Sequence, residues 1–359
     1  MTAMKQFPPL ITFFLLYFWV APLWADNSAV VLTYHRVGED AIPSTNVRIE
    51  QFETHLDYLK NNNFNVWPLT KILDAYEQGE ILPPRTVAIT FDDAYLSVYL
   101  EAFPRLKEYG FPFSVFVATD SVDKKYKGYM SWQQLRELKA AGVTIANHSK
   151  SHTFMVRHLL GEDEKAYYRR MSDEIELAQQ RLSDELGETP KLFAYPYGEY
   201  SQELMEIVSS LGYIGVGQHS GAIDPHSLRL ALPRFPINEQ YGNISDIALK
   251  LRTYPMQLES QSITNPLWLG EQAPRLEILL GENVVGVNQL ACYFSAQGRM
   301  TIEWLDREAG HFAIQAEAPL RSGRYRYTCT APGKERRYQW FSQLWIVPPP
   351  GSVPSDHIE

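Results

Sequence analysis

Two adjacent carboxylates, Asp92 and Asp93, follow a strongly apolar run over residues 86–91. Barrels and open α/β sheets place their sites at the carboxyl ends of the strands, so chemistry is expected at this position. Side chains alternate in direction along a strand, which lets one Asp bind a metal ion while its neighbour points toward a substrate. A helix beginning near Tyr95 could use one Asp as its cap, but the other Asp would then be unexplained.

Two histidines, His148 and His152, follow a second apolar run that ends at Ala146. At this spacing they can converge on one side of a helical turn and bind one ion through neutral imidazole nitrogens. Paired histidines also occur on solvated helix faces, but a place directly after a strand favours the metal site. With Asp93 they form a set of two histidines and one carboxylate, suited to Zn²⁺ or a similar divalent ion. His158 is interpreted as an ordinary surface histidine.

A third pattern is an apolar run that is broken by Tyr195-Pro196-Tyr197-Gly198. Such a turn can aim the backbone N–H of Tyr197 into a pocket, where it would donate to an oxyanion. The same residues would be unremarkable as a plain turn from a strand to a helix.

The elements that must position these residues alternate between apolar runs and amphipathic segments from Ala29 to about Tyr254. Near-continuous apolar runs are typical of buried parallel strands, and the predicted strands are 30–34, 86–91, 113–117, 143–146 and 192–195. Two predicted helices have their apolar residues on one face: Phe52, Leu56 and Leu59 in the first, and Ile175, Leu177, Ala178 and Leu182 in the second. Ser131 has the position of a helix N-cap. This alternation predicts an α/β sheet or barrel.

After Asn265 the pattern changes to short strand-like runs separated by turn residues. These runs are 276–280, 290–294, 300–304, 312–316, 325–328 and 339–347. Their spacing predicts a small all-β sandwich-like domain, with the boundary between about Leu258 and Pro266. Trp304 and Tyr327 resemble parts of an immunoglobulin core, but the spacing is too short for a true one.

The composition limits the possible partners. The chain has 359 residues, of which 45% are hydrophobic, and this length suits one large domain plus a smaller one. Its formal net charge of -9 and the lack of a basic patch argue against nucleic acid as a partner.

The N-terminus predicts export. Lys5 precedes an apolar run over residues 10–25 that turns polar at Asp26, which is typical of a secretory signal peptide. This run is short for a bilayer span, so membrane association is expected only through an uncleaved N-terminal segment. The remainder is expected in the periplasm, the cell envelope or the medium. There Cys292 and Cys329 can form a disulfide, the alternative being two buried free thiols.

Taken together, in this order and spacing, the blocks Thr90-Phe91-Asp92-Asp93, His148-Ser149-Lys150-Ser151-His152 and Tyr195-Pro196-Tyr197-Gly198 resemble the NodB-type polysaccharide deacetylase family, a carbohydrate esterase family 4-like group. The resemblance covers about residues 29–245, and Tyr34-His35-Arg36-Val37 is similar to the opening of its poly-β-1,6-N-acetylglucosamine N-deacetylase branch.

The resemblance implies a distorted (β/α)7-type barrel with a divalent metal ion on Asp93, His148 and His152. Zn²⁺ is the first choice, and Co²⁺, Ni²⁺ and Fe²⁺ accept the same ligands. It further implies Asp92 as general base and the Tyr197 N–H as oxyanion donor.

Two departures from the family pattern concern the proton-transfer groups. The Arg that the family has two residues before Pro196 is Ala194 here. Arg234 is the predicted replacement, which would hold Asp92 ionised through a charge-assisted hydrogen bond, the alternative being a surface Arg beside a Pro-rich turn. The late Leu-x-x-His block that supplies the general acid is also absent from the sequence.

His35 is the predicted general acid, because it ends the first strand and a barrel brings it to the same rim as Asp92. The alternative is a core histidine bonded to the backbone. His219 and His226 lie in a loop that no apolar strand fixes, and we do not expect them to be catalytic. The Gly that follows the two Asp residues in the family is Ala94 here, which should affect only how the loop turns.

The expected function is hydrolysis of the amide C–N bond of N-acetylglucosamine units, which releases acetate. The position of His35 favours a poly-β-1,6-linked biofilm polysaccharide over peptidoglycan or chitin-like β-1,4 chains, and an O-acetyl esterase stays open. The contrasting class is a non-catalytic saccharide-binding protein, with Trp340 and Trp345 as candidate contacts. The predicted organisation is a signal peptide (1–25), a catalytic domain (26–258), a β-sandwich (266–347) and a Pro-rich tail (348–359).

Overall fold

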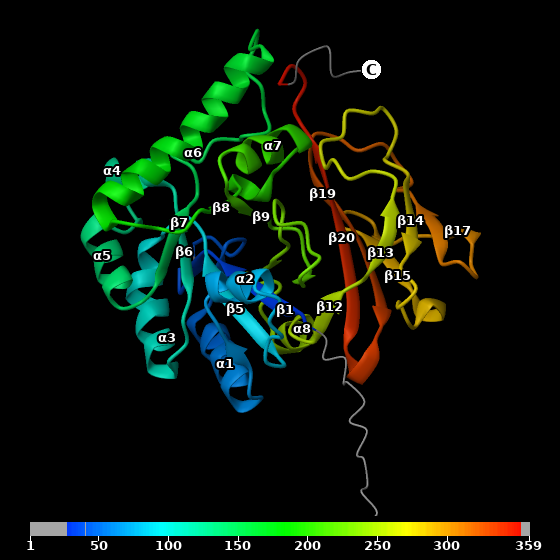
Figure 1. Ribbon diagram of the computed structural model, residues 1–359, viewed down its shortest axis with the longest axis horizontal. Helices are drawn as coiled ribbons and strands as arrows, with labels where there is room; N and C mark the ends of the chain where they lie inside the picture. Colours follow the sequence, from blue (N-terminus) through cyan, green and yellow to red (C-terminus); the bar gives the residue numbers. More distant parts are fainter. Residues whose placement is uncertain (1–26, 40, 353–359) are drawn as a thin grey trace, which may run out of the picture.

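A computed structural model describes residues 27–39 and 41–352. In Figure 1 an α/β unit, blue to green, lies beside an all-β unit, yellow to red. The long strands β19 (Gly323–Pro332) and β20 (Tyr338–Val347) belong to the all-β unit and lie on its side toward the α/β unit. The predicted signal peptide falls outside the described residues, as do residues 353–359 of the predicted tail. Within the described part of the chain, no helix is long and apolar enough to span a bilayer.

The α/β unit is built on a curled sheet of nine strands among the described residues. Their order is β10-β1-β5-β6-β7-β8-β9, with β11 beside β1 and β4 beside β5. Paired strands are parallel except for β10, which is antiparallel to β1. The bounds are β1 (Ala29–Tyr34), β4 (Asn65–Val66), β5 (Thr86–Phe91), β6 (Ser114–Val117), β7 (Thr144–Asn147), β8 (Leu192–Ala194), β9 (Ile214–Val216), β10 (Ala222–Ile223) and β11 (Phe235–Pro236).

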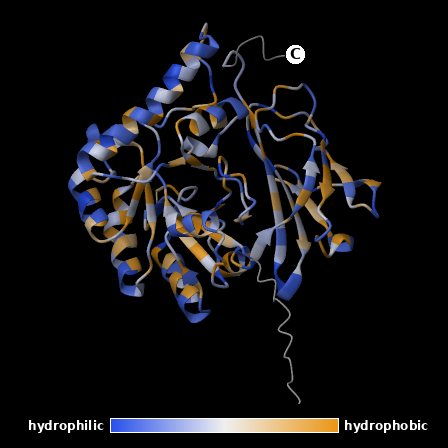
Figure 2. Ribbon diagram, in the orientation of Figure 1, coloured by the Kyte–Doolittle hydropathy of each residue, from blue (hydrophilic) through white to orange (hydrophobic). Residues whose placement is uncertain are grey.

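Helices cover the outside of this sheet, and a small parallel pair, β2 (Arg36–Val37) and β3 (Asn46–Val47), lies after β1. The helices are α1 (Ile49–Asn61), α2 (Leu69–Glu77), α3 (Phe103–Tyr109), α4 (Thr119–Asp123), α5 (Trp132–Ala140), α6 (Glu164–Leu186), α7 (Gln202–Ser210) and α8 (Ile244–Lys250). Figure 2 shows α6 as largely hydrophilic along its length, whereas the central strands carry many apolar residues. Buried apolar side chains of β1, β5 and β6 pack against α1 and α5 in one core cluster.

The segment 232–236 joins the two ends of the curled sheet. Leu232 forms a parallel bridge with Val216 at the end of β9, and β11 pairs in parallel with β1. These pairings are short, so the ring is a distorted barrel. Arg234 stands between the two contacts, which places it in the wall of the barrel.

The predicted strands of this unit correspond to β1, β5, β6, β7 and β8. The capping position of Ser131 is also confirmed, because its hydroxyl accepts a hydrogen bond from the Gln134 N–H at the start of α5. One helix position is wrong: Leu177 points away from the core of α6 and is 52% exposed. Ala178 takes the buried position beside it, since adjacent helical residues face different directions.

The all-β unit is a sandwich of two sheets, in the strand orders β12-β20-β19-β15-β16 and β13-β14-β18-β17. The remaining bounds are β12 (Thr253–Pro255), β13 (Leu258–Gln261), β14 (Leu276–Leu280), β15 (Ala291–Phe294), β16 (Gly298–Arg299), β17 (Glu303–Asp306) and β18 (His311–Ile314). The predicted fold class, an α/β barrel followed by a small sandwich, is therefore confirmed. The first of these strands begin before residue 266, and the division of the chain into domains stays a prediction.

The expected disulfide joins Cys292 to Cys329. These two residues are directly opposite each other on β15 and β19, so the bond links neighbours within one sheet. An immunoglobulin core would instead link two facing sheets.

Strand β20 serves both units, because its side chains alternate between its two faces. Leu344 and Ile346 pack in a core cluster with barrel residues, whereas Trp345 is fully buried in the sandwich core. Trp340 packs edge to face on Phe235 of the barrel, with ring centroids 5.2 Å apart. The suggested saccharide contact at Trp345 is therefore wrong, because its ring is buried.

Candidate active site

The chain turns sharply directly after β5, at Asp92 and Asp93. Both carboxylates are buried, and the Asp92 N–H donates to the Tyr34 carbonyl of β1 at 3.0 Å, which extends the strand pairing by one residue. Asp93 and Ala94 then adopt left-handed conformations, with φ of 73° and 59°. Such angles are uncommon for residues other than Gly. The turn sends the two carboxylates to different partners.

Asp93 converges with His148 and His152. His148 Nε2 lies 3.3 Å and His152 Nε2 3.1 Å from the same oxygen, Asp93 Oδ1. One ligand atom of each residue lies within 4.8 Å of the others. The spacing of the two histidines predicted that they converge on a helical turn, and this part of the prediction is wrong. The segment is a loop in which Ser149 and His152 have φ of 66° and 56°.

The three residues fit a divalent metal ion. The Nδ1–H of His148 donates to the Ala194 carbonyl at 2.7 Å, which leaves Nε2 as the lone-pair nitrogen. This Nε2 is buried and meets no hydrogen-bond partner in the described part of the chain. A buried nitrogen of this kind normally has a partner. Two imidazole nitrogens and one carboxylate oxygen are suitable ligands for Zn²⁺ and related ions.

The charges within this group compensate one another. Burial raises the pKa of Asp93, but the close approach and charge of His148 and His152 outweigh it and hold the pKa well below its usual range. Burial lowers the pKa of His148, and the neighbouring carboxylates outweigh this effect, so the pKa is raised. The carboxylate of Asp93 is therefore ionised at neutral pH.

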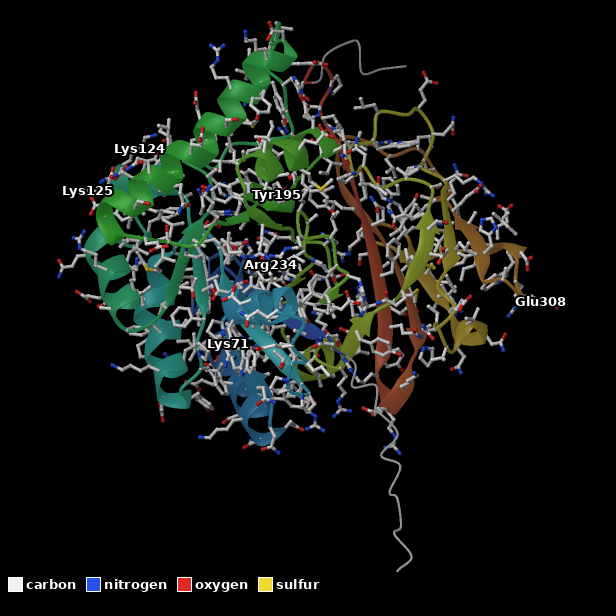
Figure 3. All side chains as sticks on the ribbon, viewed as in Figure 1. Lys71, Lys124, Lys125, Tyr195, Arg234 and Glu308 are labelled. Atoms are coloured by element: carbon white, nitrogen blue, oxygen red, sulfur yellow. A yellow bond between two sulfur atoms is a disulfide. The ribbon has the colours of Figure 1, made fainter. Side chains whose placement is uncertain are left out.

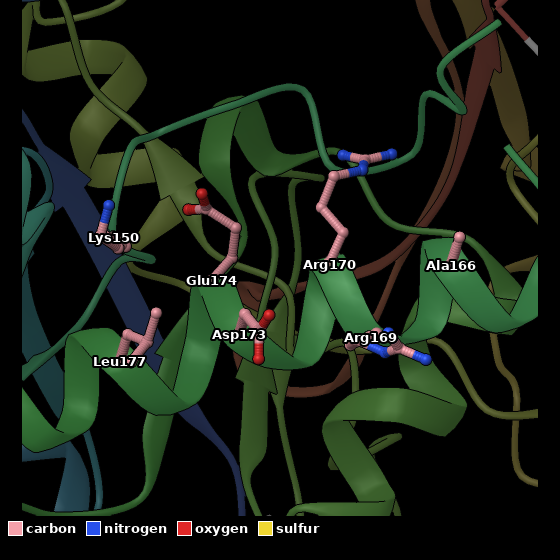
Figure 4. Close-up of a pocket in the computed structure, with 7 residues that line it drawn as sticks. All are labelled: Lys150, Ala166, Arg169, Arg170, Asp173, Glu174 and Leu177. Atoms are coloured by element: carbon pink, nitrogen blue, oxygen red, sulfur yellow. The ribbon is translucent and has the colours of Figure 1, made fainter.

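The loop that carries His152 is anchored on α6. Figure 4 shows Glu174 rising from α6 toward this loop, next to Lys150 and above Asp173. The Ser151 N–H and Oγ–H donate to the Glu174 carboxylate at 2.8 and 2.7 Å. The Lys150 N–H also donates to the Glu174 backbone carbonyl at 2.9 Å. These bonds hold the loop in its left-handed turns.

Arg234, labelled in Figure 3, lies within the α/β unit, where it is paired with Asp92. Arg234 Nη1 donates to Asp92 Oδ1 at 2.8 Å and Nη2 to Oδ2 at 2.7 Å, and both side chains are 0% exposed. Arg234 also donates to the Gly217 carbonyl and the Thr90 hydroxyl, so its position is fixed on several sides. Burial raises the pKa of Asp92, but Arg234 and then His148 outweigh it, and the pKa is lowered.

The turn at Tyr197 is strained. Tyr197 has φ of 61° between Pro196 and Gly198, so its peptide is held in a left-handed turn. The Tyr197 ring stacks on Phe154, with centroids 4.0 Å apart, and lies edge to face against His152 at 4.5 Å. The turn therefore borders the metal-ligand group.

The chain is similar to known polysaccharide deacetylases. Residues 79–216 match the family model described as "Polysaccharide deacetylase". The chain carries a polysaccharide deacetylase domain. Over 236 residues it is 25% identical to the poly-β-1,6-N-acetyl-D-glucosamine N-deacetylase of Staphylococcus aureus strain MSSA476, covering 60% of this chain and 81% of that protein.

Solved structures agree on the fold of the deacetylase domain. IcaB from Ammonifex degensii is 26% identical with a TM-score of 0.55, and the match covers 63% of this chain and 97% of that one. The Streptococcus pyogenes deacetylase PplD, solved with acetate, is 20% identical with a TM-score of 0.56, and the match covers 62% of this chain and 98% of that one.

His35 of the α/β unit lies near Asp92, and Gln218 contacts both. The Gln218 Nε2–H donates to Asp92 Oδ2 at 3.2 Å, and the same nitrogen lies 3.5 Å from His35 Nε2. Burial lowers the pKa of His35, against the opposing charges of Asp93 and Asp92. Gly198 has to be a Gly, because a Cβ there would lie 2.5 Å from Gln218 Cβ.

The other histidines of the α/β unit are placed differently. His219 is buried against Tyr200, and burial lowers its pKa to about 3. His226 is exposed. The interpretation of His158 as a surface residue is wrong: it is buried and stacked on Tyr167, with centroids 3.9 Å apart. Its Nε2 lies 3.1 Å from Glu203 Oε2.

The sandwich also reaches the Tyr197 turn of the deacetylase domain. Arg324 of β19 donates from Nη1 to the Tyr197 carbonyl at 2.5 Å, and its Nε lies 3.6 Å from Glu199 Oε1. Burial raises the pKa of Glu199, against the charges of Arg324 and Arg157. Arg324 therefore ties the turn to the second unit.

Gln218 and Arg324 were not predicted from the sequence. Gln218 follows β9, which is too short to show a periodic pattern, and Arg324 lies outside the region that resembles the family. The structure brings together the predicted metal ligands and the predicted pair of Asp92 and Arg234. The catalytic roles assigned to them stay predictions.

Proposed function

We propose that this protein is a metal-dependent hydrolase that removes N-acetyl groups from an N-acetylglucosamine polymer and releases acetate. The observation that carries the proposal is the buried bidentate pair of Arg234 and Asp92 beside the converged ligands Asp93, His148 and His152. The poly-β-1,6-linked polymer is the preferred substrate. Similarity to the staphylococcal N-deacetylase supports this choice.

A divalent ion, with Zn²⁺ as first choice, would be held by Asp93, His148 and His152 and would supply Lewis-acid polarisation together with a lower pKa for water. Asp92 would act as general base, because Arg234 keeps it ionised and points its oxygens in fixed directions. The lowered pKa of Asp92 means that the base is present at neutral pH.

The Tyr197 N–H would donate to the oxyanion that develops on the acetamide carbonyl. A donor fixed before the reaction stabilises this charge more than mobile water does. Its left-handed turn, packed on Phe154 and tied to Arg324, supplies this rigidity.

His35 would donate a proton to the departing amine. Because burial lowers its pKa, His35 is neutral in the resting site and must first take up a proton. Asp92, protonated by the attacking water, is the nearby source. The Gln218 amide, which contacts both groups, would hold them in place for this transfer.

We also propose that the protein acts outside the cytoplasm. The apolar N-terminal pattern suits a signal peptide, and the Cys292–Cys329 disulfide suits an oxidising compartment.

The test is an acetate-release assay on β-1,6- and β-1,4-linked N-acetylglucosamine pentamers and on acetylated xylan, with the metal-loaded full chain. We expect release from the β-1,6 pentamer to be fastest. Release only from xylan would make the protein an O-acetyl esterase, and no release from any substrate would favour the non-catalytic saccharide-binding alternative.

Asp92→Asn and His35→Ala serve as matched variants in this assay. Removal of a general base or acid lowers the rate by roughly 10²- to 10⁴-fold. Full activity of Asp92→Asn would contradict the mechanism. Full activity of His35→Ala would leave the deacetylase standing but require another acid.

A further inference from the structure

A hollow of about 460 Å³ lies between α8 and the outer face of strands β15, β19 and β20. We call it the junction groove, and its lining residues are Leu249, Tyr293, Ser295, Arg326, Thr328, Thr330, Tyr338 and Trp340. Its volume falls in the range of about 300–1,000 Å³ that is common for small-ligand sites. None of these residues belongs to the candidate active site.

The groove combines aromatic rings with hydroxyl groups. Tyr293 and Tyr338 are 41% and 40% exposed, which is high for aromatic residues on a sheet. The Trp340 ring is fixed by its contact with Phe235 and by hydrogen bonds from Nε1 to Ser220 and Ser342. Rigid rings of this kind offer an apolar face with a polar edge, which matches the alternating surface of a sugar.

Arg326 supplies an uncompensated positive charge. Its Nε donates to Thr328 Oγ1 at 3.2 Å, and among the described residues it forms no ion pair. Its two Nη groups therefore keep their donors for another partner. A second cation, Lys250 at the end of α8, lies near enough for the two charges to oppose each other.

Strand β19 runs from the groove toward the candidate active site. Arg326 and Arg324 are two residues apart on β19, so they lie on the same face of the strand, roughly 7 Å apart along it. Arg324 in turn donates to the Tyr197 carbonyl at the rim of the active site. One face of β19 thus carries Arg326 in the groove and Arg324 at the rim of the active site.

We propose that the junction groove binds an N-acetylated stretch of the polymer while another unit of the same polymer chain lies in the active site, and that it discriminates against the deacetylated product. This inference rests on the proposed function. An acetamide carbonyl and sugar hydroxyls can accept hydrogen bonds from Arg326. A deacetylated unit carries an ammonium group, which Arg326 and Lys250 repel.

Binding is tested in the full chain with Asp92→Asn, which is expected to slow turnover. Titration of the β-1,6-linked N-acetylglucosamine pentamer and of its fully deacetylated form is followed by calorimetry. We expect the acetylated pentamer to bind about tenfold more tightly, the size of one hydrogen bond to a charged group. When Arg326→Glu is combined with Asp92→Asn, the chain should prefer the deacetylated pentamer by a similar factor, because the charge in the groove is reversed.

Tyr293→Ala is a second variant that removes a stacking ring at an exposed position, and it should weaken binding of the acetylated pentamer several-fold. Arg307→Glu is the matched control, because Arg307 is exposed beside β17 in the other sheet. It should change neither affinity.

Equal affinities for both pentamers would contradict the proposed role of the groove. A preference that is unchanged in Arg326→Glu would contradict it as well. In that event acetate release by the wild-type chain would still support the proposed function. If the wild-type chain releases no acetate from any amino-sugar oligomer, the proposed function fails first, and the groove proposal fails with it.

Discussion

Asp92 keeps its charge in a fully buried position because Arg234 meets it with two parallel hydrogen bonds. A buried carboxylate without such a partner would take up a proton. The pKa of Asp92 is lowered in the folded protein. The stability that this pair contributes is therefore present above the ordinary Asp pKa and is lost as the pH falls through the lowered one.

Replacing Arg234 by Gln should raise the pKa of Asp92, because burial then acts without a compensating charge. The acid limb of the profile of kcat/KM against pH should move to higher pH, and activity at neutral pH should fall by roughly 10²-fold. Removing one partner of a buried pair also destabilises a protein by about 3–5 kcal/mol.

Arg234→Lys keeps the charge while it removes the bidentate geometry, so its acid limb should shift less than that of Arg234→Gln. If the acid limb stays in place in both variants, Arg234 does not control the ionisation of Asp92.

Gln218 is a positioning residue between the proposed base and the proposed acid. Gln218→Leu should lower kcat by about tenfold, since the Asp92 oxygen loses a donor and His35 its neighbour. KM should change little, and the acid limb should move slightly to higher pH. An unchanged kcat with a normal pH profile would show that Gln218 only fills space.

The loop that carries His152 depends on α6, a helix that is distant in sequence. Glu174→Ala removes the acceptor for two hydrogen bonds from Ser151, which should loosen the loop. Loss of such outer partners typically lowers metal affinity by about 10–100-fold. Zn²⁺ affinity measured by competition with a chelator checks this.

Asp173→Ala is the matched control, because Asp173 is the exposed neighbour of Glu174 on the same helix. Equal Zn²⁺ affinities of the two variants would contradict the anchoring role of Glu174.

The elements that the sequence predicts well are those with long patterns. Strand β5 has six buried residues in a row, and its end places the Asp pair correctly. By contrast, β9 and β11 have three and two residues, too few to show a period, yet Gln218 follows the first and Arg234 directly precedes the second. The left-handed loop at His152 was also missed, because the residue spacing alone suits a helix equally well.

At the scale of the whole molecule, the sandwich contributes to the deacetylase site through Arg324. The family resemblance stops before the sandwich, so this contact between units could be found only in the structure. Arg324→Ala should lower kcat by about tenfold with little change in KM, because the Tyr197 N–H then loses its fixed direction.

Arg324→Lys should restore part of the rate by donating to the same carbonyl, and Arg321→Ala, at an exposed position in the preceding loop, should have no effect. If Arg324→Ala instead raised KM alone, the sandwich would act on substrate binding and not on the Tyr197 turn.

A metal titration tests the proposed metal-dependent deacetylation most directly. Zn²⁺ is added to the chelator-treated full chain while acetate release from the β-1,6-linked pentamer is measured. We expect no release without metal and an increase up to one ion per chain, held by Asp93, His148 and His152. The same titration of His148→Ala should give neither tight binding nor release. Full acetate release by the metal-free chain would contradict metal-dependent deacetylation.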